Sequence, residues 1–304
     1  MNILITTSSF STDSFPEYFS IIKNPYGRKL TESEVLELIL KYKPAGMIAG
    51  VEPLTRNVLS RAKELKVISR CGTGLDSVDL DAAKELGISV LNTPDAPTEA
   101  VAELTTGAVL SLLRKISTAD ALVKSGNWKQ LKGNLLSEKT VGIIGVGRIG
   151  TRVAEIMNLF ECRLLGYDPF IKEHRLCEMK PLDELLRESD IVTLHVPYTE
   201  SNHHIIAKRE LSLMKKTAQL VNIARGGLVD EEALCEALKT GTIAGAAIDC
   251  FEQEPYKGEL ISMGEKVVLT AHMGSAAAET RKKMELEAVK NLLQKLKELG
   301  LSEA

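Results

Sequence analysis

The sequence predicts an α/β protein with two doubly wound parallel-sheet domains. Short apolar runs alternate with helical patterns along the chain, in two successive series. These runs lack the apolar–polar alternation of a strand that is half exposed, so the strands are expected to be buried on both faces, as in parallel sheets. The length of 304 residues also suits two domains, because single cores stop growing near about 250–300 residues.

The first βα series runs from Asn2 to Asn92. Thr31 and Glu34 have the spacing of a capping box, which predicts where its first helix begins. The predicted strands are Asn2–Thr6, Gly46–Ala49, Val67–Ser69 and Ile88–Asn92, and the predicted helices are Glu34–Lys43, Thr55–Leu65 and Leu80–Leu86.

A long helical pattern links the two series. It begins near Pro97, and the polar segment Ser125–Lys139 that follows is predicted to be a connection. The predicted strands of the second series are Val141–Gly145, Arg163–Tyr167, Ile191–His195, Gln219–Ile223, Ala246–Ile248 and Val267–Thr270. A last helical pattern runs through Met284 to Leu296.

The composition argues against several classes of protein. A net charge of −3 and a 4% aromatic fraction give no footprint for nucleic acid or for a membrane surface. The five cysteines form no C-x-x-C pair, and the adjacent His203 and His204 are expected to be solvated, so no metal site or disulfide framework is predicted. Met1–Phe10 lacks the basic flank of a signal peptide, and no apolar run is long enough to span a bilayer. We therefore expect a cytoplasmic protein.

The strongest local motif is G-x-G-x-x-G at Gly145, Gly147 and Gly150, between a predicted strand and a helical pattern. Glycines at this spacing permit a tight turn, close approach of a pyrophosphate, and packing of the helix on the strand. Asp168 ends the next strand, 18 residues after Gly150, where an acid can bind the adenosine ribose hydroxyls. It would repel a 2′-phosphate, so the motif predicts NAD rather than NADP.

Three ionisable residues follow later strands of the same series. Arg225, Glu254 and His272 are each placed beyond a strand's carboxyl end, where ligands bind in doubly wound sheets. Arginine can pair with a carboxylate, histidine can move a proton to or from a keto oxygen, and the acid can orient the imidazole. Singly each residue has an ordinary structural explanation, but together they predict hydride chemistry on a 2-keto acid.

These segments resemble the D-isomer-specific 2-hydroxyacid dehydrogenase family. The resemblance runs from about Ala49 to Ser275. It includes Ser69–Asp76, Asn92–Pro94, Val101–Leu104, Gly145–Gly150, Tyr167–Pro169, His195–Pro197, Ala224–Gly227, Asp249–Pro255 and His272–Ser275.

The resemblance implies a Rossmann NAD-binding domain over 97–276 and a flavodoxin-like substrate domain from 1–96 and 277–304, with a cleft between them. It also implies a homodimer through the NAD-binding domain. The implied catalytic residues are Arg225, Glu254 (the acid directly before Pro255) and His272. The implied cofactor residues are Gly145, Gly147, Arg148, Ile149, Gly150, Asp168, Val196, Pro197, Ile223, Ala224, Asp249, Gly274 and Ser275, and the implied substrate residues are Arg70, Gly72, Thr73, Gly74 and Arg225.

Several substrates stay open. Arg70–Gly74 resembles the substrate loop of short phosphoglycerate dehydrogenases, yet the segment Ala49–Pro53, where such enzymes place a phosphate-binding arginine, carries Glu52 and no basic residue. Arg70, Lys129 or Lys132 are candidates to replace it. The alternatives are a glyoxylate, hydroxypyruvate or phosphonate-type 2-keto acid reductase and, in another class, an NAD-sensing binding protein or corepressor with weak catalysis.

Overall fold

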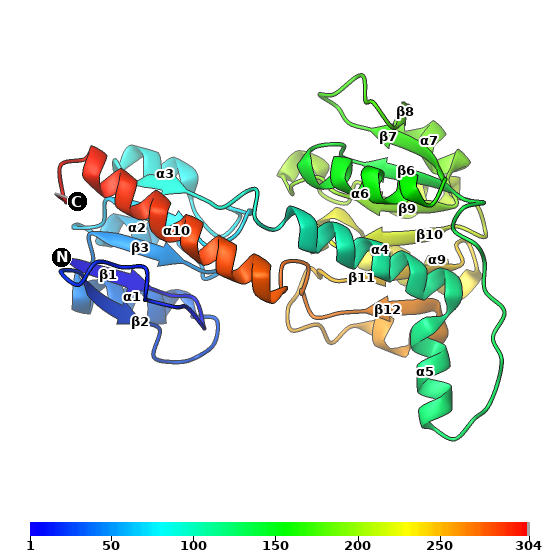
Figure 1. Ribbon diagram of the computed structural model, residues 1–304, viewed down its shortest axis with the longest axis horizontal. Coiled ribbons are helices and arrows are strands. Elements are labelled where there is room, and N and C mark those ends of the chain that lie inside the picture. The colour runs from blue at the N-terminus through cyan, green and yellow to red at the C-terminus, as the bar shows by residue number, and fades with distance from the viewer. Residues whose placement is uncertain (303–304) are drawn as a thin grey trace. The chain divides into compact units, whose positions relative to one another are not determined.

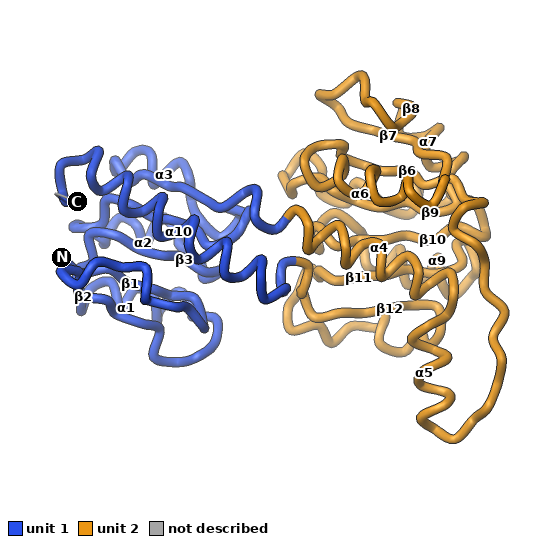
Figure 2. Tube along the Cα trace, in the orientation of Figure 1, with its two compact units in different colours: residues 1–97, 275–304 blue, residues 98–274 orange. Residues whose placement is uncertain are grey.

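The computed structural model describes residues 1–302, and the chain divides into two compact units (Figure 2). Unit 1 comprises 1–97 and 275–304, of which 303–304 lie outside the described residues, and unit 2 comprises 98–274. The chain therefore leaves unit 1, builds unit 2 and returns to unit 1 with its last helix (Figure 1).

Unit 1 is a five-stranded parallel sheet in the order β2-β1-β3-β4-β5. Strand order 2-1-3-4-5 is that of flavodoxin-like folds. The strands are β1 (Asn2–Ile5), β2 (Ser20–Lys23), β3 (Gly46–Ala49), β4 (Val67–Arg70) and β5 (Ser89–Leu91), and the helices are α1 (Glu32–Tyr42), α2 (Arg56–Arg61), α3 (Leu80–Glu85) and α10 (Ala278–Glu298).

Helices cover both faces of the first sheet. The core of one face contains α1, α2 and α3, whereas α10 packs on the other face through Met284, Ala288 and Leu292. α1 begins where the capping box predicts, since Thr31 Oγ1 accepts from the Glu34 amide and Glu34 accepts from the Thr31 amide. The far C-terminal segment thus completes a core that begins at the N-terminus.

Unit 2 is a seven-stranded parallel sheet in the order β12-β11-β10-β9-β6-β7-β8. Six of these strands follow the Rossmann order 3-2-1-4-5-6, and β12 extends the far edge. The strands are β6 (Thr140–Ile144), β7 (Arg163–Tyr167), β8 (Glu178–Met179), β9 (Ile191–Leu194), β10 (Gln219–Asn222), β11 (Gly245–Ile248) and β12 (Val267–Leu269). The helices are α4 (Thr98–Arg114), α5 (Ile116–Lys124), α6 (Arg148–Leu159), α7 (Leu182–Glu188), α8 (Lys208–Leu213) and α9 (Glu231–Thr240), with short 3₁₀ turns η1 (Glu200–Asn202), η2 (Gly226–Leu228) and η3 (Glu259–Lys266).

The second sheet is also buried on both faces. α4 and α6 supply the core of one face, and α7, α8 and α9 supply the core of the other. Two parallel-sheet α/β folds in one chain confirm the predicted fold class.

Two edge strands and one helix break differ from the sequence prediction. β2 and β8 were not predicted, because they are short and half exposed at sheet edges and have no continuous apolar run. The long helical pattern from Pro97 breaks at Lys115, which has a left-handed φ of 54°, before α5 begins. α5 buries none of its residues, so no core contact within the described chain explains its apolar side chains.

None of the described helices is both long enough and apolar enough to cross a bilayer.

Candidate active site

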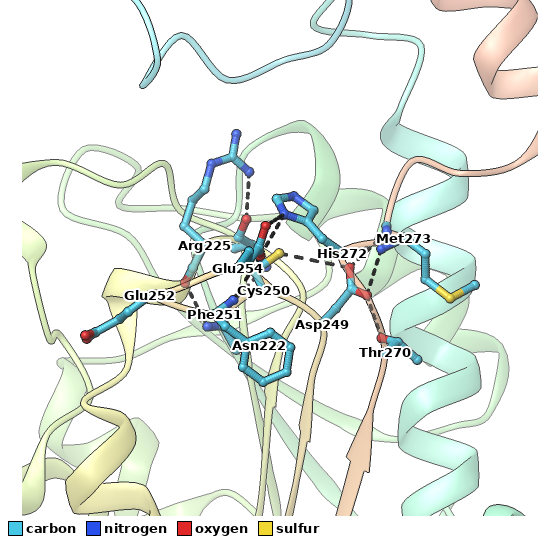
Figure 3. Close-up of polar contacts among 12 residues, drawn as sticks. Asn222, Arg225, Asp249, Cys250, Phe251, Glu252, Glu254, Thr270, His272 and Met273 are labelled. Atoms are coloured by element: carbon cyan, nitrogen blue, oxygen red, sulfur yellow. Dashed lines mark hydrogen bonds and ion pairs between the residues drawn. The ribbon is translucent and has the colours of Figure 1, made fainter. Parts of the chain in front are cut away.

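The three strands at one end of the second sheet are neighbours and parallel. β10, β11 and β12 therefore present their carboxyl ends at the same edge. Arg225 follows β10, Glu254 follows β11 and His272 follows β12, and Figure 3 draws all three side chains at this edge. The structure thus brings the three predicted catalytic residues to one sheet edge within unit 2.

His272 and Glu254 form a hydrogen-bonded pair. The imidazole Nδ1 lies 2.9 Å from each oxygen of the Glu254 carboxylate (Figure 3). Glu254 Oε1 also accepts from the backbone N–H of Phe251 at 3.1 Å, which fixes the carboxylate on its own loop. The side chains of His272 and Glu254 are 44% and 38% exposed. A carboxylate that accepts from Nδ1–H leaves Nε2 as the nitrogen that can exchange a proton with a ligand.

A buried carboxylate holds the turn that carries His272. Asp249, only 1% exposed, accepts from the backbone N–H of Met273 at 2.8 Å and of Gly274 at 2.9 Å, and from the Thr270 hydroxyl at 2.5 Å. The His272 amide bonds the Asp249 carbonyl at 2.8 Å, and His272 itself has a left-handed φ of 48°. Asp249, expected as a cofactor contact, therefore also fixes the turn that carries His272, through the two amides that follow it and the Thr270 hydroxyl that precedes it.

The Arg225 turn is fixed by a second buried polar side chain. Asn222 donates to the Arg225 carbonyl at 2.8 Å and accepts from the Ala224 amide at 3.1 Å, while Arg225 Nη1 donates to the Ala224 carbonyl at 2.7 Å. A Cβ on Gly226 would overlap the Phe251 carbonyl. The Arg225 turn and the Glu254 loop are therefore packed backbone to backbone, and only glycine fits at their contact.

His203 is exposed, as the sequence predicts, but His204 is half-buried and paired, which corrects the interpretation that both histidines are solvated. Their rings stack with centroids 3.7 Å apart, and His204 pairs through Nε2 with Glu252. The His204 amide also donates to the Gly227 carbonyl at 2.8 Å. His204 thus links the two loops that carry Arg225 and Glu254. Because Glu252 is 48 residues away in the sequence, no local motif signals this contact.

The glycine turn after β6 leaves room for a phosphate. Gly145 has φ 90°, and a Cβ there would come within 2.7 Å of the His195 carbonyl oxygen and of the Val196 side chain. A Cβ on Gly150 would overlap the Gly145 carbonyl, so the α6 helix packs directly on the strand. Gly147 instead faces open space and begins α6 without a side-chain cap. The first-turn amides, including those of Arg148 and Ile149, are thus arranged as an anion site.

Asp168 directly follows β7, beside this turn. Its carboxylate accepts from the amides of Val146 at 3.2 Å, Phe170 at 2.9 Å and Ile171 at 3.1 Å. The side chain is only half buried, and a carboxylate has about four acceptor positions, so it retains acceptor capacity for a ribose hydroxyl. The open cradle at Gly147 and this positioned carboxylate fit a dinucleotide.

The remaining predicted cofactor residues lie along the same edge of unit 2, except Ser275, which begins the return into unit 1. Val196 and Pro197 follow β9, Ile223 and Ala224 follow β10, and Gly274 packs against Ile223. His195, interpreted as structural, lies near Thr193 with its Nε2 at 3.0 Å from Oγ1, and burial lowers its pKa to about 3. It is therefore neutral at physiological pH.

Four of the five predicted substrate residues lie in unit 1, where Arg70 ends β4 and Gly72, Thr73 and Gly74 follow it, whereas Arg225 belongs to unit 2. Gly72 has φ 140° and donates to the Thr93 hydroxyl at 2.8 Å, and Asn92 donates to the Thr73 carbonyl at 2.6 Å. The buried Thr73 hydroxyl has no hydrogen-bond partner among the described residues. Arg70 donates to the Cys71 carbonyl, and Gly74 follows in the same turn. These hydrogen bonds hold the loop in place, and the Thr73 hydroxyl stays available to bind a ligand.

Glu52 is buried in the core of unit 1 and does not face solvent. It is 1% exposed, accepts from the Gly50 amide at 3.1 Å and 3.2 Å, and accepts from the Thr6 hydroxyl. Burial raises the pKa of its carboxyl, while the charge of Arg70 acts in the opposite direction. Glu52, which lies in the segment where phosphoglycerate dehydrogenases carry an arginine, thus accepts a hydrogen bond from the backbone of its own loop.

Comparison with known proteins identifies the family. Residues 106–274 match the NAD-binding domain of D-isomer-specific 2-hydroxyacid dehydrogenases. The chain belongs to the D-isomer-specific 2-hydroxyacid dehydrogenase family. It is 44% identical over 260 residues to D-3-phosphoglycerate dehydrogenase of Methanocaldococcus jannaschii, covering 83% of this chain and 49% of that relative, and so spans about half its length.

Two further relatives match over more of their length. Hydroxypyruvate reductase of Thermotoga maritima is 40% identical over 277 residues, which is 89% of each chain. The structure of D-lactate dehydrogenase from Aquifex aeolicus, complexed with NAD and lactic acid, superposes with a TM-score of 0.83 at 32% identity, over 99% of this chain and 96% of that one. The predicted family is confirmed, and with it the class of NAD-linked oxidoreductase.

Proposed function

We propose that this protein catalyses the reversible NAD-linked reduction of a small 2-keto acid to the D-2-hydroxy acid. The observation that carries the proposal is the His272–Glu254 pair, with Nδ1 2.9 Å from both carboxylate oxygens. Such a pair supplies a general acid of fixed tautomer at the edge where Arg225 also lies. A protein that only senses the dinucleotide has no need of this pair, so we favour catalysis over sensing.

Each residue of the set has a distinct role in the proposed reaction. Arg225 pairs with the substrate carboxylate and polarises the keto oxygen. His272 donates a proton from Nε2 to that oxygen and takes it back in the oxidative direction, while Glu254 stabilises the charged imidazole. NADH, when bound, supplies the hydride. Gly147 and the α6 amides hold the pyrophosphate, and Asp168 binds the ribose.

The substrate loop of unit 1 supports a carboxylate-bearing ligand. We propose that Gly72, Thr73 and Gly74 bind the substrate carboxylate together with Arg70, because the Thr73 hydroxyl is buried without a partner among the described residues. The loop after β3 has no basic side chain, and Glu52 is committed to Gly50 and Thr6. Lys129 and Lys132 lie on an exposed segment after α5. We therefore favour an unphosphorylated substrate, such as hydroxypyruvate or glyoxylate, over phosphohydroxypyruvate.

A steady-state assay of NADH absorbance tests this proposal. The panel comprises glyoxylate, hydroxypyruvate, phosphohydroxypyruvate, pyruvate and a phosphonate-bearing 2-keto acid, with NADPH as the alternative cofactor. We expect the highest kcat/KM with an unphosphorylated acid and NADH. Preference for phosphohydroxypyruvate would overturn the assignment of the side-chain pocket, and tight NADH binding without turnover of any compound would favour sensing.

We also propose a homodimer assembled through the NAD-binding domain. α5 buries no residue of its own, and Ile116, Val123, Trp128 and Leu135 on and after it are more than half exposed. An apolar surface of this kind on an extended segment is suited to burial by a second copy in a two-fold dimer. Sedimentation of Trp128→Glu beside the wild type tests it: we expect a dimer to become a monomer, and an unchanged mass excludes this surface.

A reducing compartment fits the cysteines. All five are free and buried, so we propose a cytoplasmic location.

A further inference from the structure

The proposed reaction leaves one buried thiol beside the acid–base pair without a role. Cys250 directly follows Asp249 after β11 and is 2% exposed. Its Sγ, a carboxylate oxygen of Glu254 and a ring nitrogen of His272 all lie within 4.8 Å of one another (Figure 3). Among the residues that the structure describes, this is the one group of three such side chains close enough to share a metal ion.

The geometry suits a small cation with short bonds. The three ligand atoms lie within 4.8 Å of one another, so one point lies within about 2.8 Å of all three. Zinc binds sulfur at about 2.3 Å, imidazole nitrogen at about 2.0–2.1 Å and carboxylate oxygen at about 2.0–2.2 Å. Shifts of about 0.5–0.8 Å would therefore complete three bonds. The half-exposed His272 and Glu254 give an ion access and leave a fourth position for water.

The donor set also indicates which cations fit. Thiolate and imidazole favour zinc and cobalt, whereas magnesium and calcium prefer oxygen ligands alone. The Cys250 Sγ also lies 4.0 Å from the carboxylate of Asp249. Two carboxylates, those of Glu254 and Asp249, therefore lie beside the thiol, and their negative charge favours a bound cation.

We propose that Cys250, Glu254 and His272 form an inhibitory site for a thiophilic divalent cation, represented by zinc. Binding releases the thiol proton of Cys250, and the metal takes the position of the Nδ1–H···carboxylate hydrogen bond. The ring of His272 keeps one proton, on Nε2, so the charged imidazole also releases its Nδ1 proton, whereas in the neutral ring the proton moves from Nδ1 to Nε2. The imidazole then loses the carboxylate that stabilises its charged form, so it no longer acts as the general acid. The inhibition rests on the proposed function, whereas the binding of the cation does not.

Cobalt binding to the full chain tests the site without reference to activity. The protein is titrated with Co²⁺ alone in thiol-free buffer, and absorbance is followed for the charge-transfer band of a cobalt–thiolate bond. We expect a band that saturates at one cobalt per chain in the wild type. The matched control Cys235→Ala, which removes another buried cysteine of unit 2, should keep it. Cys250→Ala and Cys250→Ser should lose it, and serine guards against a cavity that disturbs the fold.

Zinc inhibition of NADH turnover is the second readout. Zinc should displace cobalt, and EDTA should restore the rate. The zinc concentration for half inhibition should rise about tenfold or more in Cys250→Ser and stay unchanged in Cys235→Ala. Absence of the cobalt band in the wild type, or its persistence in both Cys250 variants, would overturn the site. A Cys250-dependent band without zinc inhibition would leave the site standing, overturn its inhibitory role and count against His272 as the general acid.

Discussion

Asp249 in unit 2 and Glu52 in unit 1 are both buried carboxylates that fix a turn after a strand, but only the Asp249 turn carries a predicted catalytic residue. Each is 1% exposed, each follows a parallel strand, and each accepts from a threonine hydroxyl and from backbone N–H groups, two for Asp249 and one for Glu52. The two backbone amides that donate to Asp249 directly follow His272, whereas the amide that donates to Glu52 is that of Gly50 in its own loop. A buried strand-end carboxylate is therefore a means of fixing a turn, and the turn decides whether it serves chemistry.

Asp168 adds a third case that differs in exposure. It too follows a strand and accepts three backbone amides, but its side chain is half exposed. A carboxylate that solvent reaches can exchange water for a ligand, whereas both oxygens of Glu52 are bonded within its own chain. Asp249 is predicted to contact the cofactor as well as to hold its turn, so the comparison separates Asp168, which can exchange ligands with solvent, from Glu52, which only holds the fold.

The largest effect is expected where the chemistry itself is removed. His272→Ala should lower kcat by roughly 10²–10⁴-fold, because the general acid is lost. Affinity for NADH, measured by fluorescence titration, should stay near that of the wild type. A rate within a few-fold of the wild type would show that another group carries the proton.

A smaller loss of kcat is expected when only the turn that carries His272 is loosened. In Asp249→Asn the amide NH₂ would face one of the two backbone N–H groups now bound by the carboxylate, at Met273 or Gly274. Misplacement of His272 should lower kcat about 10- to 100-fold. Thr270→Val is the matched control, since it removes one contact to Asp249 and keeps both backbone contacts. Equal kcat values for the two variants would contradict the positioning role.

Removal of the half-exposed Asp168 carboxylate should change the affinity for the cofactor and leave the rate of the chemical step unchanged. Asp168→Ala should weaken NADH about tenfold or more, because hydrogen bonds to a charged group contribute about 1.5–3 kcal/mol. NADPH should weaken less or bind more tightly, because the repulsion of its 2′-phosphate is removed. Calorimetric titration of both cofactors measures the change, and an unaltered NADH affinity would remove Asp168 from the site.

The smallest effect is expected from Glu52, the buried carboxylate of unit 1, and concerns the pH dependence of the unfolding free energy. Burial raises the pKa of Glu52 above its ordinary value of 4.5, so the folded protein binds this proton more tightly than the unfolded chain. Its contribution to stability is full below that ordinary value and is lost as pH rises through the folded pKa. Glu52→Gln does not titrate there. The unfolding free energy of the wild type relative to Glu52→Gln, from urea denaturation, should therefore fall as pH is raised from 4.5, and a pH-independent difference would contradict the raised pKa.

Much of the cofactor turn could be predicted because its reasons are local. The glycines at 145, 147 and 150 and the acid at 168 occur at a spacing that a strand–turn–helix unit requires, and the structure places them in such a unit. The Thr31 capping box was predictable for the same reason, since its partners are three residues apart. The edge strands β2 and β8 lack such a signal, because a short half-exposed strand is defined by its neighbour.

The sequence by itself determined the fold class and the dinucleotide motif, and it predicted Arg225, Glu254 and His272 as catalytic residues, because buried strands and motif spacings are set by neighbouring residues. Only the tertiary structure decided that Asp249 holds the His272 turn, that His204 pairs with Glu252, that Glu52 is sealed in a core, and that Cys250 lies beside the acid–base pair. Most of these contacts join side chains from different loops, and the order of strands in a sheet brings such loops together. No local periodicity records that order, so these contacts follow from the fold alone.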